Sequence, residues 1–139
     1  MLVTLKEILQ IAEERKIAVG SFNTPNLECL RAVLGAAEEL ELPVIIQAAQ
    51  VHEILTPVSI MGPVMVELAK RACVPVCVHL DHGETLDYVK KVLEMGFTGI
   101  MFDGSTMPYE ENVANVKKAV ELAKETGASV EAELGSMGR

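Results

Sequence analysis

Two imidazoles and a carboxylate lie within four residues of one another, at His79, Asp81 and His82. They follow an apolar run over residues 74–78 and precede Gly83, so the pattern predicts a buried strand with polar side chains at its carboxyl end. Side chains of these types can bind a metal ion and can transfer protons during catalysis. This stretch is therefore the first candidate for a functional site.

Side chains alternate along a strand, which places His79 and Asp81 on one face, whereas His82, at the turn, can point elsewhere. One imidazole is then free to bind a metal, with Asp81 beside it for proton transfer. Spacing alone leaves His82 open between a metal ligand and a hydrogen-bonded structural histidine. For His79 it favours a packing or supporting role, and for His52, after the second expected strand, a solvated loop.

Further polar residues stand at the ends of the other expected strands. The carboxyl ends of parallel strands share one edge of a sheet, and carboxylates and imidazoles converging there are what a metal site requires. Taken singly, an aspartate here can be a turn residue and a glutamate can be a strand-end charge paired with a neighbour. The residues concerned are Asn23, Asp103, Ser105, Glu131 and Glu133.

Apolar spacing predicts the elements that must position these side chains. Thr4 and Glu7 form a capping box for the first helix, and Pro25 lies in the first turn of the second. Helices are expected over residues 4–15, 25–40, 59–71 and 109–125, with one more between the cap Thr85 and the stop Gly96. Strands are expected over residues 17–23, 43–48, 74–83, 98–102 and 129–134.

Strand and helix thus alternate four times after an opening helix, and a fifth strand follows. Such alternation predicts an α/β protein with a parallel sheet and right-handed crossovers. A (β/α)8 TIM barrel needs about 250 residues, so residues 1–139 are expected to form the N-terminal part of a single barrel domain. The alternative is an open doubly wound sheet, although no glycine-rich phosphate loop follows the first strand.

Composition limits the partners and the compartment. Hydrophobic residues make up 50% of the chain and the formal net charge is −8, which predicts a globular protein that binds neither nucleic acid nor an anionic membrane. A phosphorylated metabolite remains compatible, because backbone N–H groups at helix starts can hold phosphate. Three cysteines without paired spacing predict reduced thiols and a cytoplasmic protein, and neither a signal peptide nor a membrane-spanning helix is expected.

Five motifs occur in order along the chain: AVGSFN with NLE at 18–28, HLDHG at 79–83, GFTGIMFDGS at 96–105, PYEENV at 108–113 and VEAELG at 130–135. In order and spacing they resemble the class II ketose-bisphosphate aldolases, most closely the branch of fructose- and tagatose-bisphosphate aldolases. The resemblance implies a (β/α)8 barrel that catalyses reversible retro-aldol cleavage of a ketose 1,6-bisphosphate to dihydroxyacetone phosphate and glyceraldehyde 3-phosphate. It also implies a cytoplasmic homodimer or homotetramer that acts in glycolysis or related carbohydrate metabolism.

The resemblance further implies a role for each matching position. Asp81 falls on the acid/base aspartate, and His82 falls on a zinc-binding histidine. Asp103 and Glu133 fall on carboxylates that line the metal pocket and in some members hold a second divalent ion. Asn23 falls on an asparagine at the floor of the site. His79 and Ser105 are expected to line the pocket or to support it, and a monovalent cation can assist.

The chemistry agrees with these implied roles. Retro-aldol cleavage leaves an enediolate, which a bound Zn²⁺ stabilises as a Lewis acid without a Schiff-base lysine. No lysine stands at an expected strand end.

Two features depart from the family pattern. Catalytic zinc takes three protein ligands as a rule, and the family supplies two further histidines and its phosphate loops from later strands, beyond Arg139. Activity is therefore expected of the full-length form. Ala49 stands where many members have a serine or threonine, which leaves the choice of ketose open. The alternatives are a non-catalytic half barrel that self-associates or needs a second half, and a metal-dependent hydrolase on the same barrel.

Overall fold

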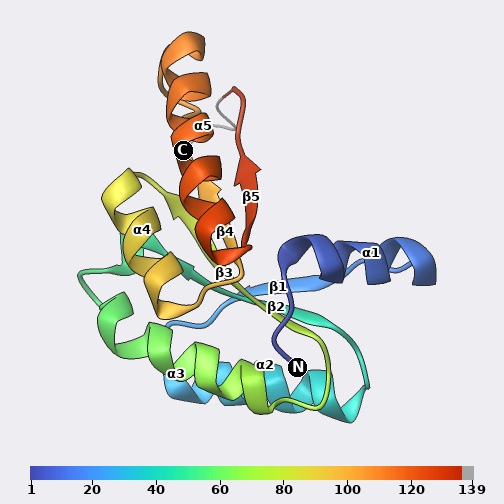
Figure 1. Cartoon of the computed structure of the whole chain (residues 1–139). Coiled ribbons are helices and arrows are strands. Elements are labelled where there is room, and N and C mark those ends of the chain that lie inside the picture. Colours follow the sequence, from blue (N-terminus) through green and yellow to red (C-terminus); the bar gives the residue numbers. More distant parts are fainter. Residues whose placement is uncertain (136–139) are drawn as a thin grey trace.

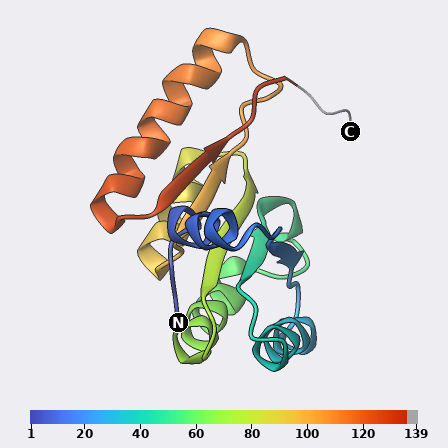
Figure 2. The ribbon, with the colours of Figure 1, turned by 90° about the vertical axis from the view of Figure 1, so that its right-hand side faces the viewer.

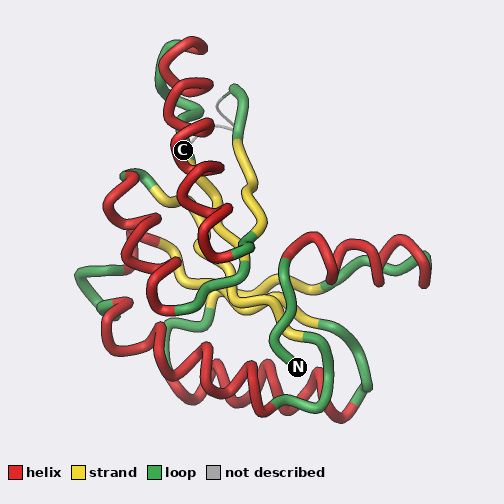
Figure 3. The backbone as a smooth tube through the Cα atoms, in the orientation of Figure 1, coloured by secondary structure: helices red, strands yellow, loops and turns green. Residues whose placement is uncertain are grey.

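A computed structural model describes residues 1–135 as a five-stranded parallel sheet with the strands in sequence order (Figures 1 and 3). Each strand leads through a helix to the next, as expected. The strands are β1 (Gly20–Asn23), β2 (Val44–Ala49), β3 (Val76–Gly83), β4 (Gly99–Phe102) and β5 (Ser129–Ala132). The helices are α1 (Leu5–Arg15), α2 (Leu27–Glu39), α3 (Val58–Arg71), α4 (Leu86–Met95) and α5 (Tyr109–Thr126), with a 3-10 turn η1 (Gln50–His52).

The two faces of the sheet are covered differently. Helices α2 to α5 pack on one face and form the main core, whereas α1 lies on the other side of the sheet (Figures 1 and 2). There Ile8 of α1 packs with Ile45 and Cys77, which point to the inner face. Sequential strand order, with the crossover helices on one face, is the arrangement of half a (β/α)8 barrel. A doubly wound sheet would reverse its strand order and place helices on both faces, so that alternative is wrong.

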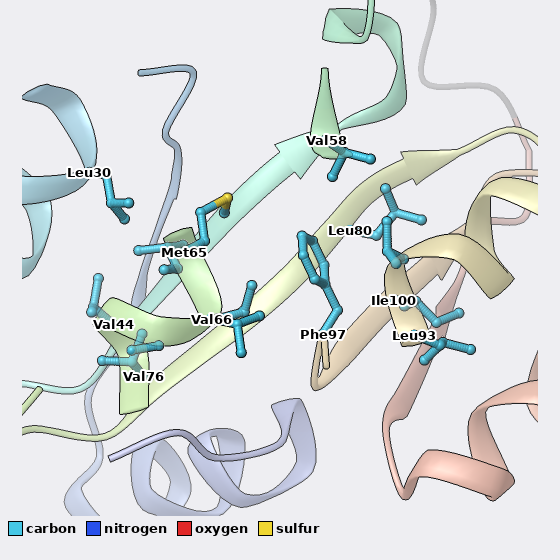
Figure 4. Packing of buried hydrophobic residues seen from close by; sticks show 14 of the residues in the cluster. Leu30, Val44, Val58, Met65, Val66, Val76, Leu80, Leu93, Phe97 and Ile100 are labelled. Atoms are coloured by element: carbon cyan, nitrogen blue, oxygen red, sulfur yellow. The ribbon is translucent and has the colours of Figure 1, made fainter. Parts of the chain in front are cut away.

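The main core is continuous from α2 to α5. Phe97 lies at its centre, between α3, α4 and the outer face of β3 (Figure 4). Leu30, Met65, Leu80 and Ile100 are also fully buried in this cluster. Because the core holds the outer faces of β2, β3 and β4, the carboxyl ends of these strands remain available for a site.

The helix boundaries agree closely with expectation. The capping box of Thr4 and Glu7 is present, and Thr85 caps α4, which ends at Gly96 in the left-handed region. The Pro25 prediction is wrong, because the Asn26 side chain caps the second helix by accepting from the Cys29 N–H, which leaves the proline outside.

The first strand is shorter than predicted. Pairing with β2 begins at Gly20, opposite Val44, so residues 17–19 have no partner strand beside them. Among residues 1–135, no helix has both the length and the apolar character needed to cross a membrane.

Candidate metal and catalytic site

The end of β3 is irregular, and this irregularity sets the directions in which its polar side chains point. The pairing of β3 with β4 shifts between Leu80 and Gly83, and His82 lies in the left-handed region with φ of +46°. A non-glycine residue in this region is uncommon, and such strain is concentrated at functional sites. The shift turns the His82 ring toward the end of β4, while Asp81 stays on the inner face of the sheet.

The His82 ring lies among three carboxylates. Its Nδ1 is 2.8 Å from Asp103 Oδ2 and 3.8 Å from Glu133 Oε2, and its Nε2 is 3.9 Å from Asp81 Oδ1. One donor atom from each of His82, Asp103 and Glu133 lies within 4.8 Å of the other two. Three carboxylates around one imidazole leave an excess of negative charge, which a cation would offset. An imidazole with carboxylates is also a donor set that suits a divalent metal.

Asp103 is the most buried of these carboxylates. Its Oδ1 accepts hydrogen bonds from the Ser105 hydroxyl at 2.6 Å and from the Ser105 N–H at 3.0 Å. Burial raises the pKa of Asp103, but these bonds and the bond with His82 outweigh it and lower the pKa to about 2. Ser105 therefore holds Asp103 through two hydrogen bonds, and its supporting role in the site stays a prediction.

Hydrogen bonding to Asp103 raises the pKa of His82, against the smaller effect of burial, and the charges of Asp81 and Glu133 act in the same direction. Nδ1 is the ring nitrogen that faces both Asp103 and Glu133, so a cation held by these three residues would take the place of its proton.

The ionised Asp103 is expected to stabilise the fold. Its folded pKa of about 2 lies below its ordinary 3.8, so the contribution is complete above pH 4 and is lost as the pH falls through 2. Asp103→Asn should therefore lower the free energy of unfolding by about 2 kcal/mol at pH 7. Urea unfolding followed by circular dichroism from pH 7 to pH 2 should show this difference shrinking below pH 4. A constant difference would contradict the assignment, and the exposed Asp87→Asn serves as the control.

Asn23 contacts the site from the opposite direction. Its Nδ2 donates to Asp81 Oδ2 at 2.9 Å, although the two residues lie 58 positions apart. Parallel pairing brings β1, β2 and β3 together so that Asn23 faces Gln47 and Ala49 faces Asp81. The asparagine thus holds one carboxylate oxygen of Asp81 and leaves the other toward His82.

His79 lies on the inner face, behind the site. Its side chain is 2% exposed, and its Nε2 is 3.1 Å from Glu131 Oε2, a contact that is close but not aligned as a hydrogen bond. Interaction with His79 lowers the pKa of Glu131, against the opposing effect of burial. The supporting role expected of His79 stays a prediction. His52 is partly buried in η1, not fully solvated as predicted.

Sequence reasoning missed Asn112. It lies in the first turn of α5, is 5% exposed, and donates through Nδ2 to the Glu133 carbonyl at 2.8 Å. Gly104 makes room for it, since a methyl group there would lie 2.3 Å from Asn112 Oδ1. A polar residue in a first helical turn is so common that the sequence gives little signal of this contact.

All seven predicted site residues thus lie at or directly behind one edge of the sheet, and none is displaced to the opposite end. A family model described as fructose-bisphosphate aldolase class-II matches residues 3–139. The chain belongs to the class II fructose-bisphosphate aldolase family. The resemblance inferred from the five motifs is confirmed.

Relatives within this aldolase family carry more than one name. Over 142 residues the chain is 42% identical to a fructose-bisphosphate aldolase of Staphylococcus aureus and 44% identical to a probable fructose-bisphosphate aldolase of Bacillus subtilis. It is 41% identical to the 6-phospho-5-dehydro-2-deoxy-D-gluconate aldolase of Halalkalibacterium halodurans. Each match covers 99% of this chain and 49% of the relative, so the chain spans about half the length of these aldolases.

A solved aldolase has the same fold. The crystal structure of the YdjI aldolase from Escherichia coli K12 superposes with a TM-score of 0.91 at 35% identity, covering 97% of this chain and 51% of that one. The five-stranded half barrel is therefore a family architecture.

Proposed function

We propose that this chain forms the N-terminal part of a single-domain class II aldolase, which cleaves a ketose 1,6-bisphosphate reversibly to dihydroxyacetone phosphate and glyceraldehyde 3-phosphate. The observation that carries the proposal is the convergence of Asp81, His82, Asp103 and Glu133 at the carboxyl edge of the sheet. Family membership supports the reaction class. The three free cysteines, without a disulfide among them, support a cytoplasmic protein, and we propose that it acts as a homodimer or homotetramer.

In this proposal each side chain has a distinct task. Asp81 exchanges a proton with the substrate oxygen at the bond that is cleaved, because its carboxylate lies on the inner face and is only 20% exposed. Asn23 holds the Asp81 carboxylate in place through the bond to Oδ2. Asp103 and Glu133 both face Nδ1 of His82, where a cation would replace the ring proton, and Ser105 holds Asp103.

The donor set fits a divalent cation. His82, Asp103 and Glu133 would hold Zn²⁺, with further ligands from a complete barrel, and bound Zn²⁺ would stabilise the negative charge that develops on the substrate. Asp103 and Glu133 are also placed to hold a second divalent ion. The excess of carboxylates over imidazoles supports this assignment.

A non-catalytic half barrel is the second candidate, and one feature favours it. An apolar groove of about 410 Å³ lies beside the unpaired edge of β1, lined by Phe22, Val33, Leu40 and Leu42 among others. Phe22 is 49% exposed and Leu40 is 65% exposed, so this surface would suit a further barrel segment or a second copy. Size-exclusion chromatography and metal analysis of the chain distinguish the two candidates: a compact, zinc-free, inactive dimer would favour the half barrel.

The reaction class is tested by what the complete protein releases from the sugar phosphate. Incubation with fructose or tagatose 1,6-bisphosphate should yield triose phosphates, detected by coupled reduction of dihydroxyacetone phosphate, and no inorganic phosphate. Phosphate release without carbon–carbon cleavage would instead indicate the metal-dependent hydrolase. One relative is named as an aldolase of 6-phospho-5-dehydro-2-deoxy-D-gluconate, so this sugar acid should be assayed together with the two ketose bisphosphates.

A further inference from the structure

One contact on the inner face of the sheet joins β3 to β5 across β4, much as the bond from Asn23 to Asp81 joins β1 to β3 across β2. His79 belongs to β3 and Glu131 belongs to β5, and β4 lies between them. Their side chains nevertheless meet, with Nε2 and Oε2 3.1 Å apart. Neighbouring parallel strands lie about 4.8 Å apart, so this contact spans roughly 10 Å of sheet.

Gly99 makes the contact possible. It is paired directly with His79 in the register of β3 and β4, and it has no side chain to block the inner face. A methyl group at this position would lie 2.5 Å from His79 Nδ1 and 3.2 Å from Cys77 Sγ. The His79 ring therefore occupies the space that any other residue at position 99 would take.

No other group satisfies the His79 ring. Its side chain is 2% exposed, and neither ring nitrogen has a hydrogen-bond partner among residues 1–135. Nδ1 is packed against Gly99. Nε2 is therefore the ring nitrogen that can interact with another side chain, and it faces Glu131. A buried ring nitrogen without an alternative partner makes the approach of Glu131 energetically important.

The contact between His79 and Glu131, called the tie below, lies directly behind the candidate site. His79 precedes Asp81 by two residues and His82 by three, and Glu131 precedes Glu133 by two. The strand β5 is four residues long, is paired on one side only, and its last two residues are exposed. Apart from β4, His79 is thus one of the side chains that connect β5 to the strand that carries His82, and the approach of His82 itself to Glu133 is another.

We propose that His79 is a positioning residue, which reaches across Gly99 to Glu131 and fixes the strand leading to Glu133 against the strand that carries His82. Its value to a metal site rests on the function proposed above, whereas the tie itself does not. His79 contacts neither substrate nor metal in this account. It sets the separation of two groups that do.

Hydrogen exchange of the β5 amides in the metal-free chain tests the tie directly. His79→Leu should accelerate exchange at residues 129–133 by about tenfold or more, because β5 loses a buried side-chain contact with β3. His79→Gln, whose amide can still donate to Glu131, should restore most of the protection. Glu131→Leu should match His79→Leu, and the double variant should be no worse than either single change, since both remove one interaction.

Gly99→Ala tests the tie without replacing His79 or Glu131. The added methyl group displaces the ring, so β5 should exchange as fast as in His79→Leu. Gly35→Ala is the matched control, because a methyl group there has no atom within 4 Å, and its β5 exchange should be unchanged. The proposal would be overturned by unchanged β5 exchange in His79→Leu, or by a loss of protection in His79→Gln as large as that in His79→Leu.

Titration with Zn²⁺ then separates the tie from the proposed function. In His79→Leu and Gly99→Ala the affinity should fall about tenfold or more, with recovery in His79→Gln. If the complete protein binds no Zn²⁺ but β5 loosens as described, the metal proposal fails and the tie stands. If it binds Zn²⁺ and the loosened variants bind equally well, the positioning role is wrong.

Discussion

Replacing Asp81 with alanine in the complete enzyme is expected to lower turnover of the sugar bisphosphate by about a hundredfold or more, while the metal stays bound. The carboxylate is 20% exposed, faces the inner side of the sheet, and has one oxygen held by Asn23 Nδ2 at 2.9 Å. Its other oxygen lies 3.9 Å from His82 Nε2. It is thus placed beside a bound cation and need not be one of its ligands.

The matched control for this change is Asp87→Asn, at an exposed aspartate in the first turn of α4. Turnover and zinc content should be measured on the same preparations, so that loss of chemistry is distinguished from loss of metal. Asn23→Ala should act in the same direction with a smaller effect, because it frees the Asp81 carboxylate without removing it. Undiminished turnover in Asp81→Ala would remove this residue from the mechanism.

His82→Ala is expected to lose the metal itself. It removes the imidazole from the cluster of His82, Asp103 and Glu133 and leaves two carboxylates, which suit hard cations better than zinc. Zinc affinity should fall at least about a hundredfold, beyond the effect of losing a residue that only supports a ligand. Elemental analysis after dialysis, together with titration, measures the loss.

His52→Ala is the control for this change, since His52 lies in η1 and belongs to no group of donor atoms around His82. It should retain zinc at the level of the unmodified protein. Stoichiometric zinc in His82→Ala would exclude the histidine as a ligand and would leave it the structural role that spacing alone also allowed.

Much of the fold follows from local chemistry that the sequence displays. The Thr4 and Glu7 capping box, the Thr85 cap and the Gly96 stop each fix a helix end through a side chain or a backbone conformation within a few residues. The apolar run before His79 predicts β3, because a short continuous apolar stretch is typical of a buried strand. The true start of the second helix was less visible, since Pro25 and Asn26 are adjacent and either can begin one.

The site was predictable as a gathering of residues and not as a geometry. Parallel strands bring their carboxyl ends together, which predicts that Asp103 and Glu133 approach His82. The register shift after Leu80, which turns the His82 ring toward Asp103, depends on how β3 meets β4 and has no local signature. The contact of His79 with Glu131 across Gly99 likewise joins strands that are not neighbours.

The central claim is that His82, Asp103 and Glu133 together hold a divalent cation beside Asp81. Anomalous scattering at the zinc absorption edge tests it most directly, measured on crystals of the complete protein grown with one equivalent of Zn²⁺. We expect one strong peak bonded to His82, with Asp103 and Glu133 around it and Asp81 adjacent. A peak at other residues, with none among these four, would contradict the account.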